Sequence, residues 1–304
     1  MSFMPIHETL EATIPEGDEG SWCSIASHQE GFKVDLADWG KRVGVEASAL
    51  SSFLPIALWG DAAEFVKGDS LFLLVFTIFS GQESVCVCGI DERLLCKCGC
   101  FGRCTFDDIF NVIAWMFRAL LTKRYPKVDH KGELFASGSV RRKLAGKALR
   151  VGGGLIAKCA DWAWLKSTLG LRGWRGEGTA KKMCWICRAS FNDEHNCHDF
   201  TSTATWRATL LSTRDFWVDV SAESAYVSAI WSVQGFCLAA VRPDWMHVCC
   251  LGILQYLCGH VLWELFQALG GSFRNDRAAC SNLDNMLAAC AKGMGVALSV
   301  TNLT

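Results

Sequence analysis

The sequence predicts an α/β fold built on a mixed β-sheet. Three apolar or alternating segments between residues 51 and 90 are typical of strands, and an amphipathic segment after residue 104 is typical of a helix. A fourth strand-like segment ends near residue 160, and the pattern becomes helical from about residue 201. Of the 304 residues, 51% are hydrophobic, which is enough for a large buried core and excludes a disordered chain.

The predicted strands and helix follow one another in chain order. Apolar β-rich runs predict strands in FLPIALWGDAAEF and DSLFLLVFTIFSG, and alternation predicts a third in ESVCVCGI. TFDDIFNVIAWMFRALLTKRYP predicts a helix, because it has the N-cap candidate Thr105, two acids in its first turn and apolar residues three and four apart. KALRVGGGLIAKCADWAW then predicts a strand that ends at Asp161.

Three regions are expected along the chain. Residues 1–50 are only weakly periodic, and we expect an irregular leader with one short helix near VDLADWGKRV. Residues 51–200 contain the predicted strands and form the expected core. Residues 201–304 are expected to form a helical insertion that includes AYVSAIWSV and the long apolar segment after Asp244.

Composition excludes several classes of protein. The first twenty residues lack the basic and apolar regions of a signal peptide, so we expect a protein that is not secreted. The apolar runs are short or are interrupted by polar residues such as His260 and Glu264, so we expect no membrane partner. Seventeen cysteines then indicate reduced thiols in the nucleus or cytoplasm, some of them metal ligands, rather than disulfides.

The net charge of -1 hides a strongly basic segment. Residues 118–188 contain 17 Lys or Arg and 4 Asp or Glu, a local net charge of +13, whereas the rest of the chain has 13 basic and 27 acidic residues. This bias, together with Trp162, Trp164 and Trp174, favours contact with a polyanion such as DNA. An ordinary solvated surface is the alternative.

Two aspartates are candidates for binding a hard metal ion. Three strands, a helix, a fourth strand and then helices are what a ribonuclease H-like α/β sheet would produce, with the first and fourth strands adjacent. Asp61 and Asp161 lie at the ends of those strands, so their carboxylates would be neighbours. Such pairs bind Mg²⁺ or Mn²⁺, and metals about 3.5 to 4 Å apart can support phosphodiester cleavage. Capping or a solvated loop is the alternative for each Asp.

CWICRASFNDEHNCH contains the sharpest pattern for a zinc site. Cys184 and Cys187 form a C-x-x-C knuckle, and His195, Cys197 and His198 follow within eleven residues. Two thiolates from one tight turn and two further ligands are typical of tetrahedral Zn²⁺. For the second pair we favour Cys197 over either histidine, and His198 over His195. Buried cysteine without a metal is the alternative.

A second cysteine-rich stretch runs from Cys86 through CKCGC to Cys104. Alternating C-x-C on a strand places both sulfurs on one face but does not give the geometry of a zinc knuckle. We therefore favour a role as small hydrophobic residues over metal binding in this stretch.

The order of these motifs resembles that of the DDE transposases of the CACTA (En/Spm) type and their fungal relatives. The matching stretches are LPIALWGD, CADWAWLKSTLGLRGWRGEGTAKKMCWIC and a later PDWMH followed by LG, within about residues 50–270. The resemblance implies that Asp61 and Asp161 are the catalytic metal-binding pair and that Cys184 and Cys187 are the family's C-x-x-C.

The resemblance also assigns the D-x-x-H signature of the insertion to Asp244 and His247. Near a helix N-terminus, side chains three residues apart face the same way, so the carboxylate can cap N–H groups and orient the imidazole. The resemblance implies that this pair works near the catalytic or DNA-binding region. A purely structural Asp–His hydrogen bond is the alternative.

The chain departs from the family at the third catalytic acid. A DDE enzyme needs one, usually a Glu on a helix after the insertion. Glu264 in VLWELF is the only Glu after the D-x-x-H signature, and it follows too soon to be assigned. We therefore expect a chain truncated before the third acid, with incomplete cleavage competence.

Two functions of different classes follow. The first is a transposase-derived protein that, if its catalytic site is intact, cleaves DNA and transfers the strand with two Mg²⁺ or Mn²⁺ ions, and that is inactive if the missing third acid is required. The second is a non-catalytic, zinc-stabilised nucleic-acid-binding module that uses the basic segment. A structural remnant without a partner is a weaker third reading, and the sequence leaves a homo-oligomer open.

Overall fold

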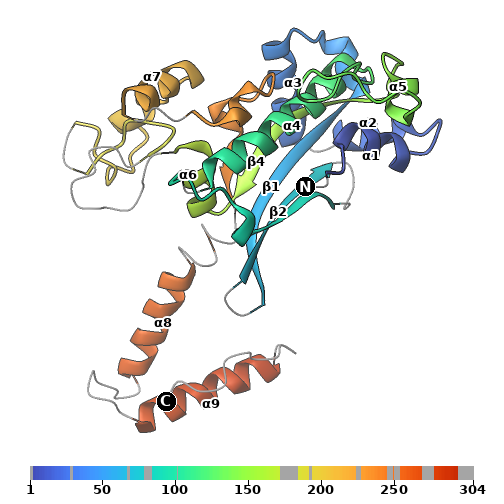
Figure 1. Ribbon diagram of the computed structural model, residues 1–304. Coiled ribbons are helices and arrows are strands. Elements are labelled where there is room, and N and C mark those ends of the chain that lie inside the picture. The colour runs from blue at the N-terminus through green and yellow to red at the C-terminus, as the bar shows by residue number, and fades with distance from the viewer. Residues whose placement is uncertain are drawn as a thin grey trace. The chain divides into compact units, whose positions relative to one another are not determined.

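A five-stranded mixed sheet organises the chain in the computed structural model (Figure 1). Its strands are β1 (Phe53–Val66), β2 (Asp69–Ile78), β3 (Ser84–Asp91), β4 (Gly152–Ala160) and β5 (Val241–Pro243). Their order across the sheet is β3-β2-β1-β4-β5. β2 is antiparallel to both β1 and β3, whereas β4 is parallel to both β1 and β5. The predicted α/β class with a mixed sheet is confirmed.

The chain divides into two compact units, Met1–Pro243 and Asp244–Thr304. The sheet lies in the first unit, which therefore continues past residue 200. None of the described helices is long and apolar enough to cross a membrane. The residues that the structure describes are 3–27, 30–66, 69–78, 84–100, 102–171, 184–191, 194–223, 227–244, 249, 254–268 and 277–293.

β4 lies in the middle of the core, and all nine of its residues are buried. Its glycines allow helices to pack closely on both faces of the strand. A Cβ at Gly154 would lie 2.5 Å from the ring of Trp39 in α3 (Glu30–Val43), and a Cβ at Gly153 would lie 3.3 Å from Leu120 in α4 (Arg103–Thr122). Because neighbouring residues of a strand face opposite sides, α3 covers one face of β4 and α4 covers the other.

α4 confirms the predicted helix but not its predicted cap. The helix begins at Arg103, after Gly102, whose φ of 81° lies in the left-handed region. Thr105 lies in the first turn instead, and its hydroxyl accepts a hydrogen bond from the backbone N–H of Cys96 at 2.9 Å. The glycine sets the start of the helix because it adopts the left-handed conformation without a Cβ clash.

The N-terminal segment is helical rather than irregular. It contains α1 (Ile6–Thr13), α2 (Glu19–Ser27) and α3, of which only α3 overlaps the expected short helix. Ile6 and Leu10, four residues apart, are buried in the main core, and α1 packs against α4. Two apolar residues four apart give only a weak helical pattern in the sequence, so this helix was not predicted. Tertiary packing supplies most of the stability of so short a helix.

The remaining α-helices come after α4 in the sequence, and α5, α6 and α7 precede β5. The first unit also contains α5 (Val140–Leu144), α6 (Trp162–Leu169) and α7 (Thr213–Glu223), and the second unit contains α8 (Gln255–Ala268) and α9 (Arg277–Gly293). Residues 201–304, which were expected to form a helical insertion, also contain β5, a strand of the sheet. Of AYVSAIWSV, Ala229–Ser232 forms a single 3-10 turn.

Candidate metal centres

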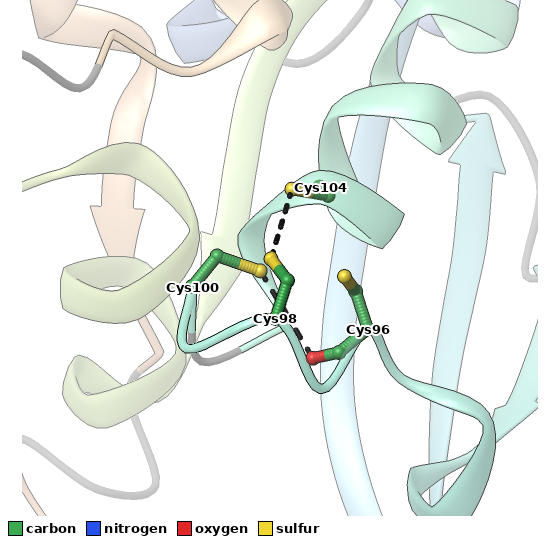
Figure 2. Close-up of side chains that lie close together, drawn as sticks. All are labelled: Cys96, Cys98, Cys100 and Cys104. Atoms are coloured by element: carbon green, nitrogen blue, oxygen red, sulfur yellow. Dashed lines mark hydrogen bonds between the residues drawn. The ribbon is translucent and has the colours of Figure 1, made fainter.

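Four cysteines gather between β3 and the first turn of α4 (Figure 2). The Sγ atoms of Cys96, Cys98, Cys100 and Cys104 all lie within 4.8 Å of one another, and together they could hold a metal ion such as zinc. Cys98 Sγ and Cys104 Sγ are 3.8 Å apart. We call these four residues the cysteine cluster.

The local backbone explains why the sulfurs converge. β3 ends at Asp91, which caps the 3-10 turn Glu92–Leu94 by accepting a hydrogen bond from Arg93 N–H. The loop that follows contains Gly99, with φ of 89°, and Gly102. These left-handed glycines turn the chain sharply, so alternate cysteines point inward instead of lying along an extended strand.

Hydrogen bonds bias the cluster toward a thiolate at Cys100. The backbone N–H of Cys104 and the side chain of Cys98 hydrogen-bond to Cys100 and lower its pKa to about 6. The same network raises the pKa of Cys104 to about 12, because its thiol hydrogen-bonds to Cys100 and Cys98. A thiolate at the N-terminus of α4 is also favoured by the helix dipole.

The expectation of small hydrophobic cysteines holds for only part of this stretch. Cys88 on β3 is 4% exposed and belongs to the core, as expected. The cysteine cluster is different, because Cys98 and Cys104 are exposed and their sulfurs face one another. The signal that could have identified it is C-x-C-x-C-x3-C interrupted by two glycines, which is typical of a loop rather than a strand.

The predicted strand-end position is confirmed for Asp161, which directly follows β4, but it is wrong for Asp61. β1 continues to Val66, and Asp61 pairs with Leu73 of β2 inside the strand, because the hairpin with β2 extends β1 beyond its pairing with β4. β1 and β4 pair in parallel, and their last paired residues are Gly60 and Ala160. Asp61 and Asp161 each come directly after that pair. Asp61 is exposed and Asp161 is half-buried.

Both carboxylates also have local hydrogen bonds. Asp161 caps α6, where its Oδ1 accepts a hydrogen bond from Trp164 N–H at 2.6 Å. Asp61 Oδ1 accepts one from the N–H of Ala62 at 2.8 Å. An ionised carboxylate has about four lone-pair positions on two oxygens, so a single N–H bond leaves it able to bind a cation.

A buried lysine lies close to Asp161. Lys158 on β4 is 0% exposed, its Nζ donates to the carbonyl of Cys159 at 2.9 Å, and it lies 3.9 Å from the ring centroid of Trp164. Burial lowers the pKa of Lys158 to about 7, and the electrostatic influence of Cys159 and Asp161 opposes this shift. Trp164 packs directly over Gly60, where a Cβ would lie 2.5 Å from the indole ring. The indole of Trp164 therefore covers the sheet at Gly60, the residue before Asp61.

The predicted zinc knuckle lies beside α6. The side chains of Cys184 and Cys187 hydrogen-bond to one another, and burial raises the pKa of Cys187 to about 11. Trp185 in the same turn packs on Trp162, the residue after Asp161, with ring centroids 5.0 Å apart.

The second half of the predicted zinc site lies in the loop that follows. Cys197 N–H donates to the Ser190 carbonyl at 2.7 Å, and the ring of His198 packs on Phe191. The four sulfurs of the cysteine cluster lie within 4.8 Å of one another. Among the described residues, no equally close group of three ligand atoms combines Cys184 or Cys187 with Cys197, His195 or His198. Zinc at Cys184, Cys187, Cys197 and His198 stays a prediction.

The D-x-x-H pair is only partly described. Asp244 follows Pro243 in the sequence and begins the second unit. His247 lies outside the described residues. The D-x-x-H role of Asp244 and His247 stays a prediction.

The basic segment is partly neutralised within the protein. Arg141 pairs with Glu8 at 2.6 Å, and Arg150 pairs with Glu11 and Glu19, each at 3.1 Å. Acids of α1 and α2 thus face basic residues far along the chain.

A cavity of about 420 Å³ lies at the C-terminal end of α4. Several of its cations are exposed to solvent and remain available to a ligand. Its lining includes the basic residues Arg118, Arg124, Lys127 and His130, the rings of Trp115 and Tyr125, and the carboxylate of Asp129.

No family model, curated protein or solved structure matches this chain.

Proposed function

We propose that the first unit is a ribonuclease H-like core of the transposase type that binds DNA and carries out metal-dependent phosphodiester chemistry. The observation that carries this proposal is the parallel pairing of β1 and β4, which ends at Gly60 and Ala160, so that Asp61 and Asp161 are the next residues of the two segments. The strand order β3-β2-β1-β4-β5, with β2 as the antiparallel partner of β1, supports it.

The donor set fits a hard cation. Carboxylate oxygens are preferred ligands of Mg²⁺ and Mn²⁺, and Asp61 is open to solvent and hence to substrate. A bound metal pair would supply an activated water or 3′-hydroxyl and would stabilise the leaving oxygen. Asp61 and Asp161 would hold the ions, while the cap between Asp161 and Trp164 fixes the direction of one carboxylate.

Asp244 and His247 belong to this proposal as the D-x-x-H pair, with the role that the sequence resemblance implies. Asp244 is the residue after Pro243, and β5 pairs with β4 up to Pro243 and Ala160. A contribution from Asp244 predicts that Asp244→Asn lowers cleavage without lowering DNA affinity.

The test is cleavage and strand transfer by the full chain on plasmid DNA with Mg²⁺ or Mn²⁺. Because the third acid is not assigned, we expect weak metal-dependent nicking, which Asp61→Asn and Asp161→Asn should each abolish. Asn retains the oxygen that accepts each backbone hydrogen bond, so both variants should fold.

Asp91→Asn is the matched control, because Asp91 also caps a turn at a strand end but lies on β3 at the sheet edge. Equal activity of wild type and both variants, or activity retained in chelator, would overturn the proposal.

A second function is supported by the basic cavity at the end of α4. We infer that a non-catalytic module would hold nucleic acid there, with phosphates at the cations and bases against the half-buried rings of Trp115 and Tyr125. This function needs no Mg²⁺, and its affinity falls steeply with salt.

Arg118→Ala combined with Lys127→Ala should weaken DNA binding and reduce the salt slope, d log K/d log[salt], by about 2. Lys33→Ala combined with Lys41→Ala removes the same charge from exposed positions on α3 and should have little effect. DNA affinity that does not respond to the first pair would exclude the cavity as the binding site.

A further inference from the structure

We propose that the cysteine cluster binds one zinc ion through all four thiolates. The residues are Cys96, Cys98 and Cys100 of the loop after β3, and Cys104 of α4. This site is separate from the predicted zinc knuckle at Cys184 and from Asp61 and Asp161. It requires neither of them to be occupied.

The spacing of the sulfurs fits a single tetrahedral ion. With a Zn–S distance of about 2.3 Å, the edge of a regular ZnS4 tetrahedron is about 3.8 Å. The distance from Cys98 Sγ to Cys104 Sγ is 3.8 Å, and the other pairs lie within 4.8 Å. Closing the remaining distances requires shifts of about an ångström or less in a loop whose sulfurs already face one another (Figure 2).

The donor chemistry selects the class of metal. Four thiolates favour soft or borderline ions and disfavour Mg²⁺ and Ca²⁺, which prefer oxygen ligands. Four protein ligands around one ion also leave no open position, which is the arrangement of a structural zinc site rather than a catalytic one.

The surroundings offset the charge of the site. Four thiolates with Zn²⁺ carry a net charge of -2. Lys97 and Arg103 lie within and directly after the loop, and the backbone N–H of Cys104 at the start of α4 points to Cys100. Positive side chains and a helix N-terminus both stabilise negative charge.

Bound zinc would clamp the loop after β3 to the beginning of α4. The loop is already joined to α4 by the hydrogen bond from Cys96 N–H to Thr105. Phe106, two residues after Cys104, packs edge-on against Trp164, with ring centroids 5.7 Å apart. Zinc therefore fixes the end of α4 that contacts α6.

The experiment measures zinc in the purified, reduced full chain by elemental mass spectrometry. The double variant Cys98→Ser/Cys104→Ser should lose one equivalent of zinc relative to wild type. The control Cys86→Ser/Cys258→Ser removes two exposed cysteines outside the cluster and should retain the wild-type amount. Equal zinc in wild type and the cluster variant would overturn the proposal.

A second measurement uses the wild-type chain and does not depend on how a variant folds. Zinc should protect Cys96, Cys98, Cys100 and Cys104 together from alkylation, and Co²⁺ in its place should give the intense visible bands of tetrahedral cobalt–thiolate. A Cys98–Cys104 disulfide in the native protein, or alkylation unaffected by zinc, would also overturn it. Neither measurement involves DNA. The zinc site can therefore be disproved while the proposed DNA cleavage stands, and DNA cleavage can be disproved while the zinc site stands.

Discussion

The cysteine cluster and the pair Asp61 and Asp161 are candidate metal centres of opposite character. The cluster has four soft ligands already within 4.8 Å of one another, gathered by one short loop and one helix turn. The aspartate pair offers two hard ligands, which follow the last paired residues of β1 and β4 and are about a hundred residues apart in the sequence. The cluster is complete in itself, whereas the carboxylate pair needs further ligands.

This difference separates a structural centre from a reactive one. A closed set of four ligands binds its ion tightly and stabilises the local fold. An open set of two carboxylates binds Mg²⁺ weakly and leaves positions for water and substrate phosphates. The two centres should therefore respond very differently to metal removal and to mutation.

Removing zinc should give the largest effect. With free zinc a thousandfold above its Kd, binding stabilises the folded chain by about 4 kcal/mol. In a unit of this size, a chelator should then lower Tm by roughly 10 °C. The measurement is thermal unfolding followed by circular dichroism, with and without chelator. The variant Cys98→Ser/Cys104→Ser should unfold at the lower Tm in both conditions, and Mg²⁺ near its Kd should raise the stability of wild type by only about 0.4 kcal/mol.

A wild-type chain that carries zinc but has the same Tm with chelator would contradict the assignment of the cluster as a stabilising centre. Its metal would then be bound without being coupled to folding.

Lys158→Met should raise the free energy of unfolding. The pKa of Lys158 falls from its ordinary value of 10.5 to about 7 because burial disfavours the charged amine. Between pH 7 and 10.5 the unfolded state binds more protons, so the stability of wild type rises with pH in that window and is lost as pH falls through it. Methionine removes this penalty, and we expect about 2 to 4 kcal/mol of added stability at pH 7.

Denaturant unfolding at pH 7 and pH 10 measures this effect, and the variant should show the flatter pH dependence. Lys166→Met is the control, because Lys166 is an exposed lysine on α6. If Lys158→Met destabilises the chain at pH 7, the buried amine is instead a required partner of the charges beside it.

Much of the sheet could be predicted from local sequence patterns. Apolar runs and alternation predicted the segments that form β1, β2 and β3, and the glycine-rich GGGLIAKCA predicted β4 with Asp161 directly after it. The order of the strands in the sheet depends on pairing between residues far apart in the chain, such as Gly60 with Ala160. The order of strands and helices along the chain can suggest this arrangement but does not determine it. β5 has three residues and gives almost no periodic signal of its own.

The cysteine cluster could not be predicted from ligand spacing alone. On an extended strand, alternate cysteines are about 6.6 Å apart, too far to share one ion through a compact tetrahedron. Gly99 and Gly102 adopt positive φ and change that geometry, but glycine permits this conformation without requiring it. The C-x-x-C at Cys184 was the stronger sequence pattern, and its remaining ligands stay a prediction.

Gly102→Ala should test the loop that builds the cluster. Gly102 has φ of 81°, and a Cβ there would lie 3.1 Å from Leu95. Forcing alanine into this conformation should cost about 1 to 2 kcal/mol and should weaken zinc binding, because the turn sets the position of Cys104. Unfolding in denaturant and competition with a chromogenic chelator measure the two effects.

Gly132→Ala is a control with a similar φ of 87° and no atom within 4 Å of the added Cβ. If the two variants lose zinc affinity equally, backbone strain acts on the chain generally and the loop has no special role.

Asp161 offers the smallest and most discriminating effect, because its cap and its proposed metal binding can be separated. Asp161→Ala removes the acceptor for Trp164 N–H and should cost about 1 kcal/mol of stability. Asp161→Asn keeps an oxygen acceptor and should cost only a few tenths of a kcal/mol, since Asn caps helices as well as Asp does.

If Asp161 binds a catalytic cation, both variants lose metal-dependent DNA cleavage despite their different stabilities. If it acts as a cap alone, activity follows stability, and Asp161→Asn remains as active as wild type. Parallel unfolding curves and nicking rates for these two variants therefore distinguish a reactive strand end from an ordinary helix start.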